Sequence, residues 1–306
     1  MPFYLAILLL AGCAATPQTE ALLSGREEGA VLEHELVDVP FFPQDEYQCG
    51  PAALATVLAD SGVAVTPKQL VSMVYVPERK GSFQVEMMAA ARRHDRIPYR
   101  IEPELKAVMT EVKAGHPVLV LQNLGLDWYP RWHYAVVVGY DVASGDFILR
   151  SGDIKRRVTA FKAFENTWGR SQFWGFVLLK PGELPASGRE KDYFLAVSEY
   201  AEQGTEEHVY AAMAAGLERW PESKYLLMGV GNHYARNQEL EHAVMAYEKV
   251  LEVEPDYAPA HNNLAWVLGE QGNYAAARLH AEKAVELGGP YLEQYRLTLS
   301  ELEKVR

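Results

Sequence analysis

The C-terminal third of the chain repeats itself with a period of 34 residues. The run Glu248-Lys249-Val250-Leu251-Glu252 recurs as Glu282-Lys283-Ala284-Val285-Glu286, and Ala243 corresponds to Ala277 at the same offset. A fixed period of this length indicates a stack of similar helical units, each of which buries its apolar face against its neighbours. We therefore expect this part of the chain to form an all-α solenoid.

The repeat pattern resembles the tetratricopeptide repeat. Copies fit residues 190–223, 224–257 and 258–291, and residues 291–304 would cap the stack. The middle copy carries the expected residues at its signature positions, namely Gly231, Tyr234, Ala243, Tyr247 and Pro255. In the last copy, Ala265 stands where glycine is usual and Gly289 where proline is usual. The resemblance implies paired helices over residues 190–306. It leaves open whether they form a spacer or a groove for a peptide or partner protein.

The two halves of the chain differ in charge. Residues 1–189 hold 21 acidic and 19 basic residues, a balance of -2, and residues 190–306 hold 20 and 10, a balance of -10, which together make the net charge of -12. Surfaces that bind nucleic acid are basic, so this composition excludes that class of partner. The acidic second half indicates a solvated helical surface. A segment rich in proline, serine and glycine, residues 183–189, is the expected linker between two domains.

Upstream of this linker, residues 34–182 show helical patterns first and extended patterns later. Helices are expected at residues 50–60, 66–74, 83–93 and 105–114, and strands at 97–101, 117–121, 133–141, 146–150 and 173–179. Helices followed by antiparallel strands predict an α+β domain. The hydrophobic content of 49% over 306 residues is enough for two folded domains.

Cys49 stands where a loop becomes the first of these helices. A thiol there gains thiolate character from the partial positive charge of the helix N-terminus. Far along the chain, His133 opens an apolar strand, and its imidazole can take the thiol proton and return it to a leaving amine. Gln44 could donate its side-chain N–H to the developing oxyanion, beside the backbone N–H of Cys49. These residues predict a cysteine acyl-transfer site; the alternative is a Cys49 that only fills space in a core.

The pattern Gln-x-x-x-x-Cys-Gly-Pro, followed later by His-Tyr-Ala-Val-Val-Val-Gly-Tyr, resembles the papain-like cysteine peptidases related to bacteriocin processing, over about residues 36–180. The resemblance implies a papain-like fold with Gln44 as the oxyanion residue, Cys49 as the nucleophile and His133 as the base. The members best known for function cleave leader peptides after a double glycine. Their transporter segments are missing from this sequence, so the leader-export role is not expected to carry over.

The third catalytic position stays open. The family usually places Asp-Pro after the strand that follows the histidine strand, whereas here that strand runs into Ser151-Gly152-Asp153. Asp153 is a plausible group to orient His133. Ser151 could occupy the position instead and would accept the imidazole proton more weakly, and Asp141 lies at the other end of the histidine strand and fits less well.

Residues 1–13 resemble the signal of a bacterial lipoprotein. The apolar run from Phe3 to Leu10 is too short to span a bilayer, which needs about 20 residues, but it suits a secretory signal. The following Leu10-Ala11-Gly12-Cys13 resembles the lipobox, which implies lipid attachment to the Cys13 thiol, and Ala14 favours the outer membrane. No lysine or arginine precedes the run, so the true start of the chain stays open. Residues 14–33 are mostly small or polar and are expected to be a tether.

The other candidate groups carry less weight. Cys13 and Cys49 could form a disulfide in an oxidising compartment, but each has a better local explanation. The basic run Lys155-Arg156-Arg157 is expected to be a solvated strand edge, with contact to substrate carboxylates as the alternative. The remaining histidines share no ligand spacing, so neither a metal nor a cofactor is expected; they are His34, His94, His116, His208, His233, His242, His261 and His280.

Together these patterns predict a lipid-anchored cysteine peptidase of the bacterial cell envelope, facing the periplasm from the outer membrane. Its partners would be a peptide or protein substrate and, through the repeats, a possible protein partner. Two alternatives use the same residues. One is a non-catalytic scaffold that binds a peptide without cutting it, and the other is a thiol acyltransferase.

Overall fold

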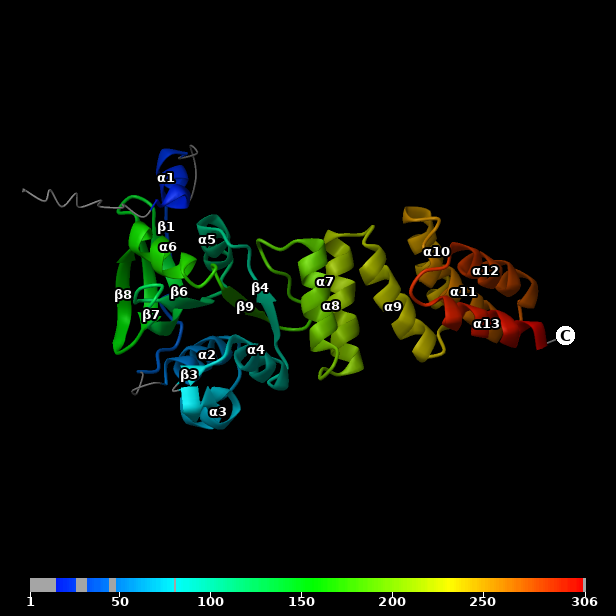
Figure 1. Cartoon of the computed structure of the whole chain (residues 1–306), viewed down its shortest axis with the longest axis horizontal. Helices are drawn as coiled ribbons and strands as arrows, with labels where there is room; N and C mark the ends of the chain where they lie inside the picture. Colours follow the sequence, from blue (N-terminus) through cyan, green and yellow to red (C-terminus); the bar gives the residue numbers. More distant parts are fainter. Residues whose placement is uncertain (1–14, 26–31, 44–47, 80, 305–306) are drawn as a thin grey trace, which may run out of the picture. The chain divides into compact units, whose positions relative to one another are not determined.

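The computed structural model describes residues 15–25, 32–43, 48–79 and 81–304. Two compact units make up the chain. The first comprises Met1–Asp60, Ala64–Ser82 and Ile101–Phe176, and the second comprises Ser61–Val63, Phe83–Arg100 and Val177–Arg306. Figure 1 shows the elements of both units.

The first unit is built on an antiparallel sheet. Its strands are β1 (Glu33–Glu35), β5 (Val118–Asn123), β6 (Trp132–Asp141), β7 (Asp146–Ser151), β8 (Ile154–Ala160) and the start of β9 (Gly175–Leu179). They lie in the order β9-β5-β6-β7-β8, and β1 pairs with the far end of β6. The expected α+β fold is therefore confirmed, with the expected strand pair β6 and β7 at its centre.

Helices cover both faces of this sheet. They are α1 (Pro17–Ser24), α2 (Cys49–Asp60), α3 (Pro67–Val74), α5 (Leu105–Lys113) and α6 (Phe161–Gly169), with a short 3-10 helix, η1 (Pro77–Arg79), between the two-residue strands β2 (Tyr75–Val76) and β3 (Gly81–Ser82). Helices α2 and α3 lie on one side of the strands and α5 and α6 on the other (Figure 1). Helix α2 is buried on all sides from Gly50 to Leu58, as expected for a helix whose every face is apolar. It therefore holds its first residue, Cys49, in a fixed place against β6.

The start of α3 follows from local chemistry. Pro67 occupies the first turn, where a missing N–H costs nothing. The Gln69 side chain reaches back and accepts the backbone N–H of Thr66 at 2.8 Å. This helix therefore begins where the sequence predicted it.

The segment expected as a tether is partly folded, so that expectation is wrong for residues 17–24. The carboxylate of Glu165 on α6 accepts the backbone N–H of Gln18 at 3.0 Å and that of Thr19 at 2.8 Å. The Thr19 hydroxyl donates to the same carboxylate at 2.6 Å. A buried acidic group at a helix N-terminus satisfies free N–H groups and favours the helix dipole. Sequence reading missed α1 because its capping group lies on another helix, far along the chain.

The second unit contains the repeat helices. They are α7 (Glu190–Tyr200), α8 (Glu206–Arg219), α9 (Lys224–Arg236), α10 (Leu240–Val253), α11 (Ala258–Glu270), α12 (Tyr274–Leu287) and α13 (Leu292–Lys304). A Cβ at Gly231 on α9 would come within 2.6 Å of the Tyr247 ring on α10, so only glycine allows the two helices to pack this closely. The tetratricopeptide repeat fold is confirmed, and each helix pair falls within one of the expected copies.

The division between the units differs from the boundary expected at 183–189. Helix α4 (Gln84–Arg93) and strand β4 (Ile97–Arg100) group with the repeat helices, and β4 pairs with β9, whose residues 177–179 belong to this unit. Polar contacts within the second unit explain why the segment around α4 and β4 groups with the repeat helices. The Tyr200 hydroxyl donates to Asp95, and Arg92 forms an ion pair with Glu199.

Among the described residues, no helix combines the length and the apolar character that crossing a bilayer requires. The apolar run from Phe3 to Leu10, Cys13 and the expected signal lie outside the described residues.

Candidate functional site

The thiol of Cys49 lies at the first residue of α2, beside the start of β6. The backbone N–H groups of Tyr134, Gly50 and Cys49 itself lie close enough to the sulfur to lower the pKa of the thiol. The amide nitrogen of Tyr134 is covalently bonded to the carbonyl carbon of His133. The sulfur therefore lies next to the backbone of the histidine that the sequence pairs with it, although 84 positions separate Cys49 from His133.

The imidazole of His133 is held by a serine on the neighbouring strand. Its Nε2 lies 2.8 Å from Oγ of Ser151 at the end of β7. The strand register explains the contact, because Val137 lies opposite Leu149. Side chains alternate between the two faces of a sheet. His133 lies four residues before Val137 and Ser151 lies two residues after Leu149, so both side chains are on the same face.

Asp153 and Asp141 lie elsewhere. Asp153 is exposed in the two-residue turn that joins β7 to β8, where Ser151 pairs with Ile154 and Gly152 has φ of +63°. The tight turn leaves the carboxylate at the hairpin tip. The Oδ1 of Asp141 accepts the backbone N–H groups of Ala143 and Ser144 at 2.8 and 3.1 Å, and these bonds cap the turn after β6. Of the three candidates, the structure places Ser151 beside the imidazole.

Burial sets the protonation of both groups. It raises the pKa of the Cys49 thiol, and the three backbone N–H groups offset only part of this effect. The pKa of His133 is lowered to about 4, mainly by burial and to a smaller extent by the positive charge of Arg157. At neutral pH the pair is therefore a thiol and a neutral imidazole rather than a preformed ion pair.

Arg157 belongs to the basic run Lys155-Arg156-Arg157 on β8, whose arginines have different surroundings. This strand ends the sheet and is largely exposed, as expected for a solvated edge. Arg156 pairs with Glu35 of β1 at 2.9 Å. Arg157 lies opposite Leu149 and so faces the same side of the sheet as His133. It is exposed, which leaves its guanidinium accessible to a ligand.

Arg150 is a structural residue of the site that sequence reading missed. It is buried on β7, and its guanidinium donates to the carbonyl oxygens of Val37 at 3.1 Å and Lys155 at 2.8 Å. It thereby ties the extended lead-in before α2 to the sheet. No local pattern marks such a residue, because one of its partners, Val37, lies 113 positions away in the chain. Gln44, the expected oxyanion residue, and Cys13 lie outside the described residues.

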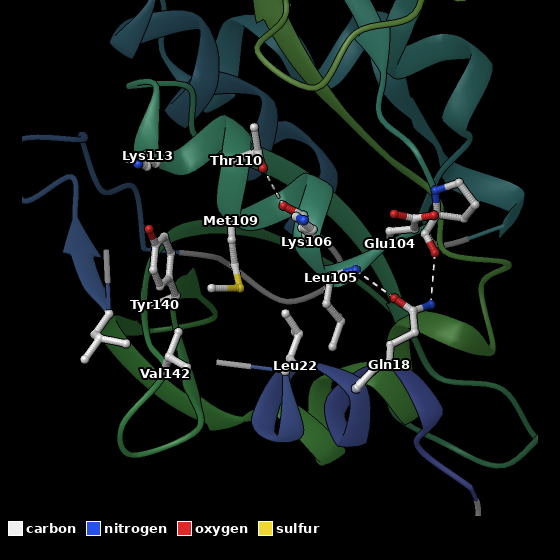
Figure 2. A pocket seen from close by; sticks show the side chains of 14 residues that line it. Gln18, Leu22, Glu104, Leu105, Lys106, Met109, Thr110, Lys113, Tyr140 and Val142 are labelled. Carbon is white, nitrogen blue, oxygen red and sulfur yellow. Dashed lines mark hydrogen bonds between the residues drawn. The ribbon is translucent and has the colours of Figure 1, made fainter. Parts of the chain in front are cut away.

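A separate cavity of about 750 Å³ lies at the opposite end of β6. Figure 2 shows Leu22 of α1, Leu105 and Met109 of α5, and Tyr140 and Val142 around it. Tyr140 follows Tyr134 by six residues, which is about 20 Å along a strand. This cavity is therefore distinct from the thiol site. Within the described ranges, no group of three or more His, Cys, Asp and Glu side chains could hold a metal ion.

Two protein-family models match parts of the chain. The Peptidase_C39 like family model matches residues 36–175, just under half of the chain. A tetratricopeptide repeat model matches residues 246–279. No curated protein matches the chain.

Several solved structures are distantly similar. A protein from Bacillus anthracis described as a C39-like peptidase is 18% identical, with a TM-score of 0.42 over 48% of this chain and 98% of its own. The TPR2B domain of yeast Sti1, solved with Hsp70, is 16% identical, with a TM-score of 0.36 over 38% of this chain and 98% of its own. The first TPR of Spaghetti (RPAP3), bound to an HSP90 peptide, is 15% identical, with a TM-score of 0.35 over 38% of this chain and 90% of its own.

The motif around Cys49 and His133, the antiparallel sheet that carries His133 and the two family matches agree on the architecture. The chain contains a peptidase C39-like domain at residues 36–175, followed by tetratricopeptide repeats.

Proposed function

We propose that this protein is a cysteine peptidase that hydrolyses peptide bonds through a thioester on Cys49. The sulfur attacks a peptide carbonyl carbon while His133 takes the thiol proton. His133 then returns the proton to the leaving amine as the C–N bond breaks. Water next attacks the thioester with His133 as base, which releases the acid and restores the thiol.

One observation carries the proposal. Inside the segment that matches the peptidase family, the Cys49 sulfur lies against the Tyr134 amide while the adjacent His133 ring is fixed by Ser151. A buried cysteine that only fills space needs neither an adjacent histidine nor a partner that fixes the histidine ring.

Ser151 acts as the positioning residue. When its hydroxyl oxygen accepts the Nε2–H of His133, Nδ1 is the nitrogen left free to take the thiol proton. Unlike a carboxylate, a hydroxyl does not stabilise the imidazolium by charge. This fits the low pKa of His133, about 4, and means that the proton moves during attack rather than before it. We also propose Gln44 as a side-chain donor to the oxyanion, on the sequence pattern alone.

The test is peptide cleavage with product masses. A quenched fluorescent decapeptide library is incubated with the wild-type chain and with Cys49→Ser. We expect hydrolytic products from the wild type, each pair summing to the substrate plus one water, and none from the variant. Cleavage that survives in Cys49→Ser would exclude the proposed nucleophile.

The raised pKa of the Cys49 thiol also favours one rival, a domain that binds peptide without cutting it. Such a scaffold would retain intact library peptides in both the wild type and Cys49→Ser. Products that carry an added amine in place of water would instead identify an acyltransferase.

We propose that the repeats bind a peptide or protein partner. The TPR2B domain of yeast Sti1 was solved in complex with Hsp70 and the first TPR of Spaghetti with an HSP90 peptide, which concerns those proteins. In this chain, the side chains of Asn232 and Asn263 are hydrogen-bonded across α9 and α11 at 2.9 Å, and Trp266 of α11 is exposed. Capture of a partner by the wild type but not by Trp266→Ala would support this role.

We further propose, from the lipobox-like sequence alone, that the chain is a lipoprotein of the cell envelope anchored through Cys13. Expression in a bacterium fed an alkyne-labelled fatty acid should label the wild type. The same labelling in Cys13→Ser would contradict the anchor.

A further inference from the structure

Large apolar side chains gather on the hairpin that joins β5 to β6. The five are Leu124, Leu126, Trp128, Tyr129 and Trp132, which we call the aromatic hairpin. Trp128 is 81% exposed, Tyr129 67% and Trp132 54%. Single exposed apolar residues are common, but this many within nine consecutive positions mark an interaction surface.

Hydrogen bonds hold the aromatic hairpin in shape. Oδ1 of Asn123 accepts the backbone N–H groups of Gly125 and Arg131, both at 2.9 Å. Leu126 and Tyr129 exchange backbone hydrogen bonds across the tip, at 3.2 and 3.1 Å. This network pre-organises the hairpin, so a ligand that binds there loses little affinity to ordering it.

Arg170, at the end of α6, braces the hairpin from the side. Its guanidinium donates to the carbonyl oxygen of Gly125 at 3.0 Å and to that of Asn123 at 3.3 Å. The exposed rings are therefore carried on a supported loop rather than on a free one.

The aromatic hairpin leads directly into the thiol site. Trp132 precedes His133, and the backbone amide of the next residue, Tyr134, lies close to the Cys49 sulfur. Two residues along a strand cover about 7 Å, and an extended peptide of about five residues reaches from the thiol to the hairpin tip. A polypeptide that extends from Cys49 along β6 toward the hairpin therefore passes within side-chain reach of this surface.

We propose that the aromatic hairpin is a substrate-binding surface that takes large apolar side chains of the polypeptide, within about five residues of the scissile bond. This inference rests on the proposed peptidase function and names the substrate class. Rigid aromatic side chains supply much contact area at low entropic cost and often dominate binding energy.

A lipid bilayer is the other apolar surface that such a hairpin could meet. The tip argues against it, because Asp127 stands between Leu126 and Trp128 with its side chain 86% exposed. Nε of Arg170 lies 3.9 Å from the Asp127 carboxylate. Inserting the tip would carry this carboxylate into hydrocarbon, which is costly, whereas a peptide leaves it in water.

The test separates binding from cleavage. All variants carry Cys49→Ala, so that no peptide is cut. Fluorescence anisotropy measures binding of two labelled decapeptide libraries, one built from Leu, Phe, Tyr and Trp and the other from Ser, Thr, Asn and Gln. We expect the apolar library to bind at least tenfold more tightly than the polar one, and Trp128→Ser to remove most of that preference.

The matched control is Tyr291→Ser, which removes an aromatic ring of 59% exposure from the repeat unit. It should leave the preference unchanged, and the thermal unfolding midpoint of each variant confirms that it is folded. Equal binding of both libraries would overturn the inference, as would a preference that survives Trp128→Ser. Binding to phosphatidylglycerol vesicles that needs Trp128, with no apolar preference, would overturn it in favour of a membrane surface. The binding measurement does not depend on peptide cleavage, so failure of this inference is distinct from failure of the proposed peptidase function.

Discussion

At the scale of single residues, Ser151 distinguishes this site from one with a carboxylate at the third position. Its hydroxyl fixes the His133 ring but brings no negative charge, so burial and Arg157 lower the pKa of the imidazole without opposition. Which residue would take this place was not decided by the sequence. The choice depends on the turn at Gly152, which leaves Asp153 at the hairpin tip, and on a register that no local pattern reveals.

Ser151→Asp should therefore activate the thiol at mildly acidic pH. A carboxylate beside Nε2 stabilises the imidazolium and raises the pKa of His133, which in turn favours the Cys49 thiolate. The alkylation rate of Cys49 at pH 6 should rise severalfold over the wild type. Ser151→Asn, which keeps a neutral acceptor, is the control. If both variants react at the wild-type rate, charge at this position does not control the thiol.

The low pKa of His133 also predicts how stability depends on pH. The folded pKa is about 4 and the unfolded value is 6.5, so between these values the unfolded chain binds one more proton than the folded chain. The free energy of unfolding should then rise with pH by about 1.4 kcal/mol per unit across this window, reaching about 3 kcal/mol in total. His133→Gln should lack this component. Denaturant unfolding of both chains at pH 4.5 and 6.5 measures this component. If the free energy of unfolding changed equally between the two pH values in the wild type and in His133→Gln, the burial of a neutral imidazole would be contradicted.

At the scale of elements, sequence reading succeeded where a signal was local and failed where it was not. Helix α2 and strand β6 were expected because the spacing of their apolar residues marks them. Strand β8 has almost no buried side chain to produce an alternating pattern, so only its basic run at the strand edge was noticed. Helix α1 was taken for a tether because the group that stabilises it, Glu165, belongs to α6.

Glu165→Ala should detach α1 from the first unit. The substitution removes the acceptor of three hydrogen bonds and leaves donors at a helix N-terminus without a partner, at a cost of about 2 kcal/mol. Hydrogen exchange of residues 17–24 should become much faster, while exchange in α12 of the repeat unit should not change. Unchanged protection of α1 would show that the carboxylate does not hold it.

At the scale of the whole molecule, the repeat unit includes more of the chain than the sequence indicated. The composition change at 183–189 suggested a clean boundary, and the repeat helices do begin there. The segment 83–100 nevertheless groups with them, through contacts such as Tyr200 with Asp95. Contacts between segments a hundred residues apart leave no mark on local composition, which explains the difference.

Truncation should show whether residues 83–100 depend on the repeat helices for their stability. A chain ending at residue 182 lacks the helices against which residues 83–100 pack, so its thermal unfolding midpoint should fall below that of a chain ending at residue 221, which retains α7 and α8. Circular dichroism of both chains measures the two midpoints. Equal midpoints would mean that the first domain folds independently at the sequence boundary.

The alkylation rate of Cys49 by iodoacetamide at pH 7, followed by mass spectrometry of the modified peptide, tests the central claim most directly. The comparison is between the wild type, His133→Ala and His242→Ala, the last removing an exposed histidine of the repeat unit. If His133 serves the thiol, its loss slows alkylation at least tenfold, while His242→Ala reacts like the wild type. Equal rates in all three chains would contradict a cysteine–histidine pair.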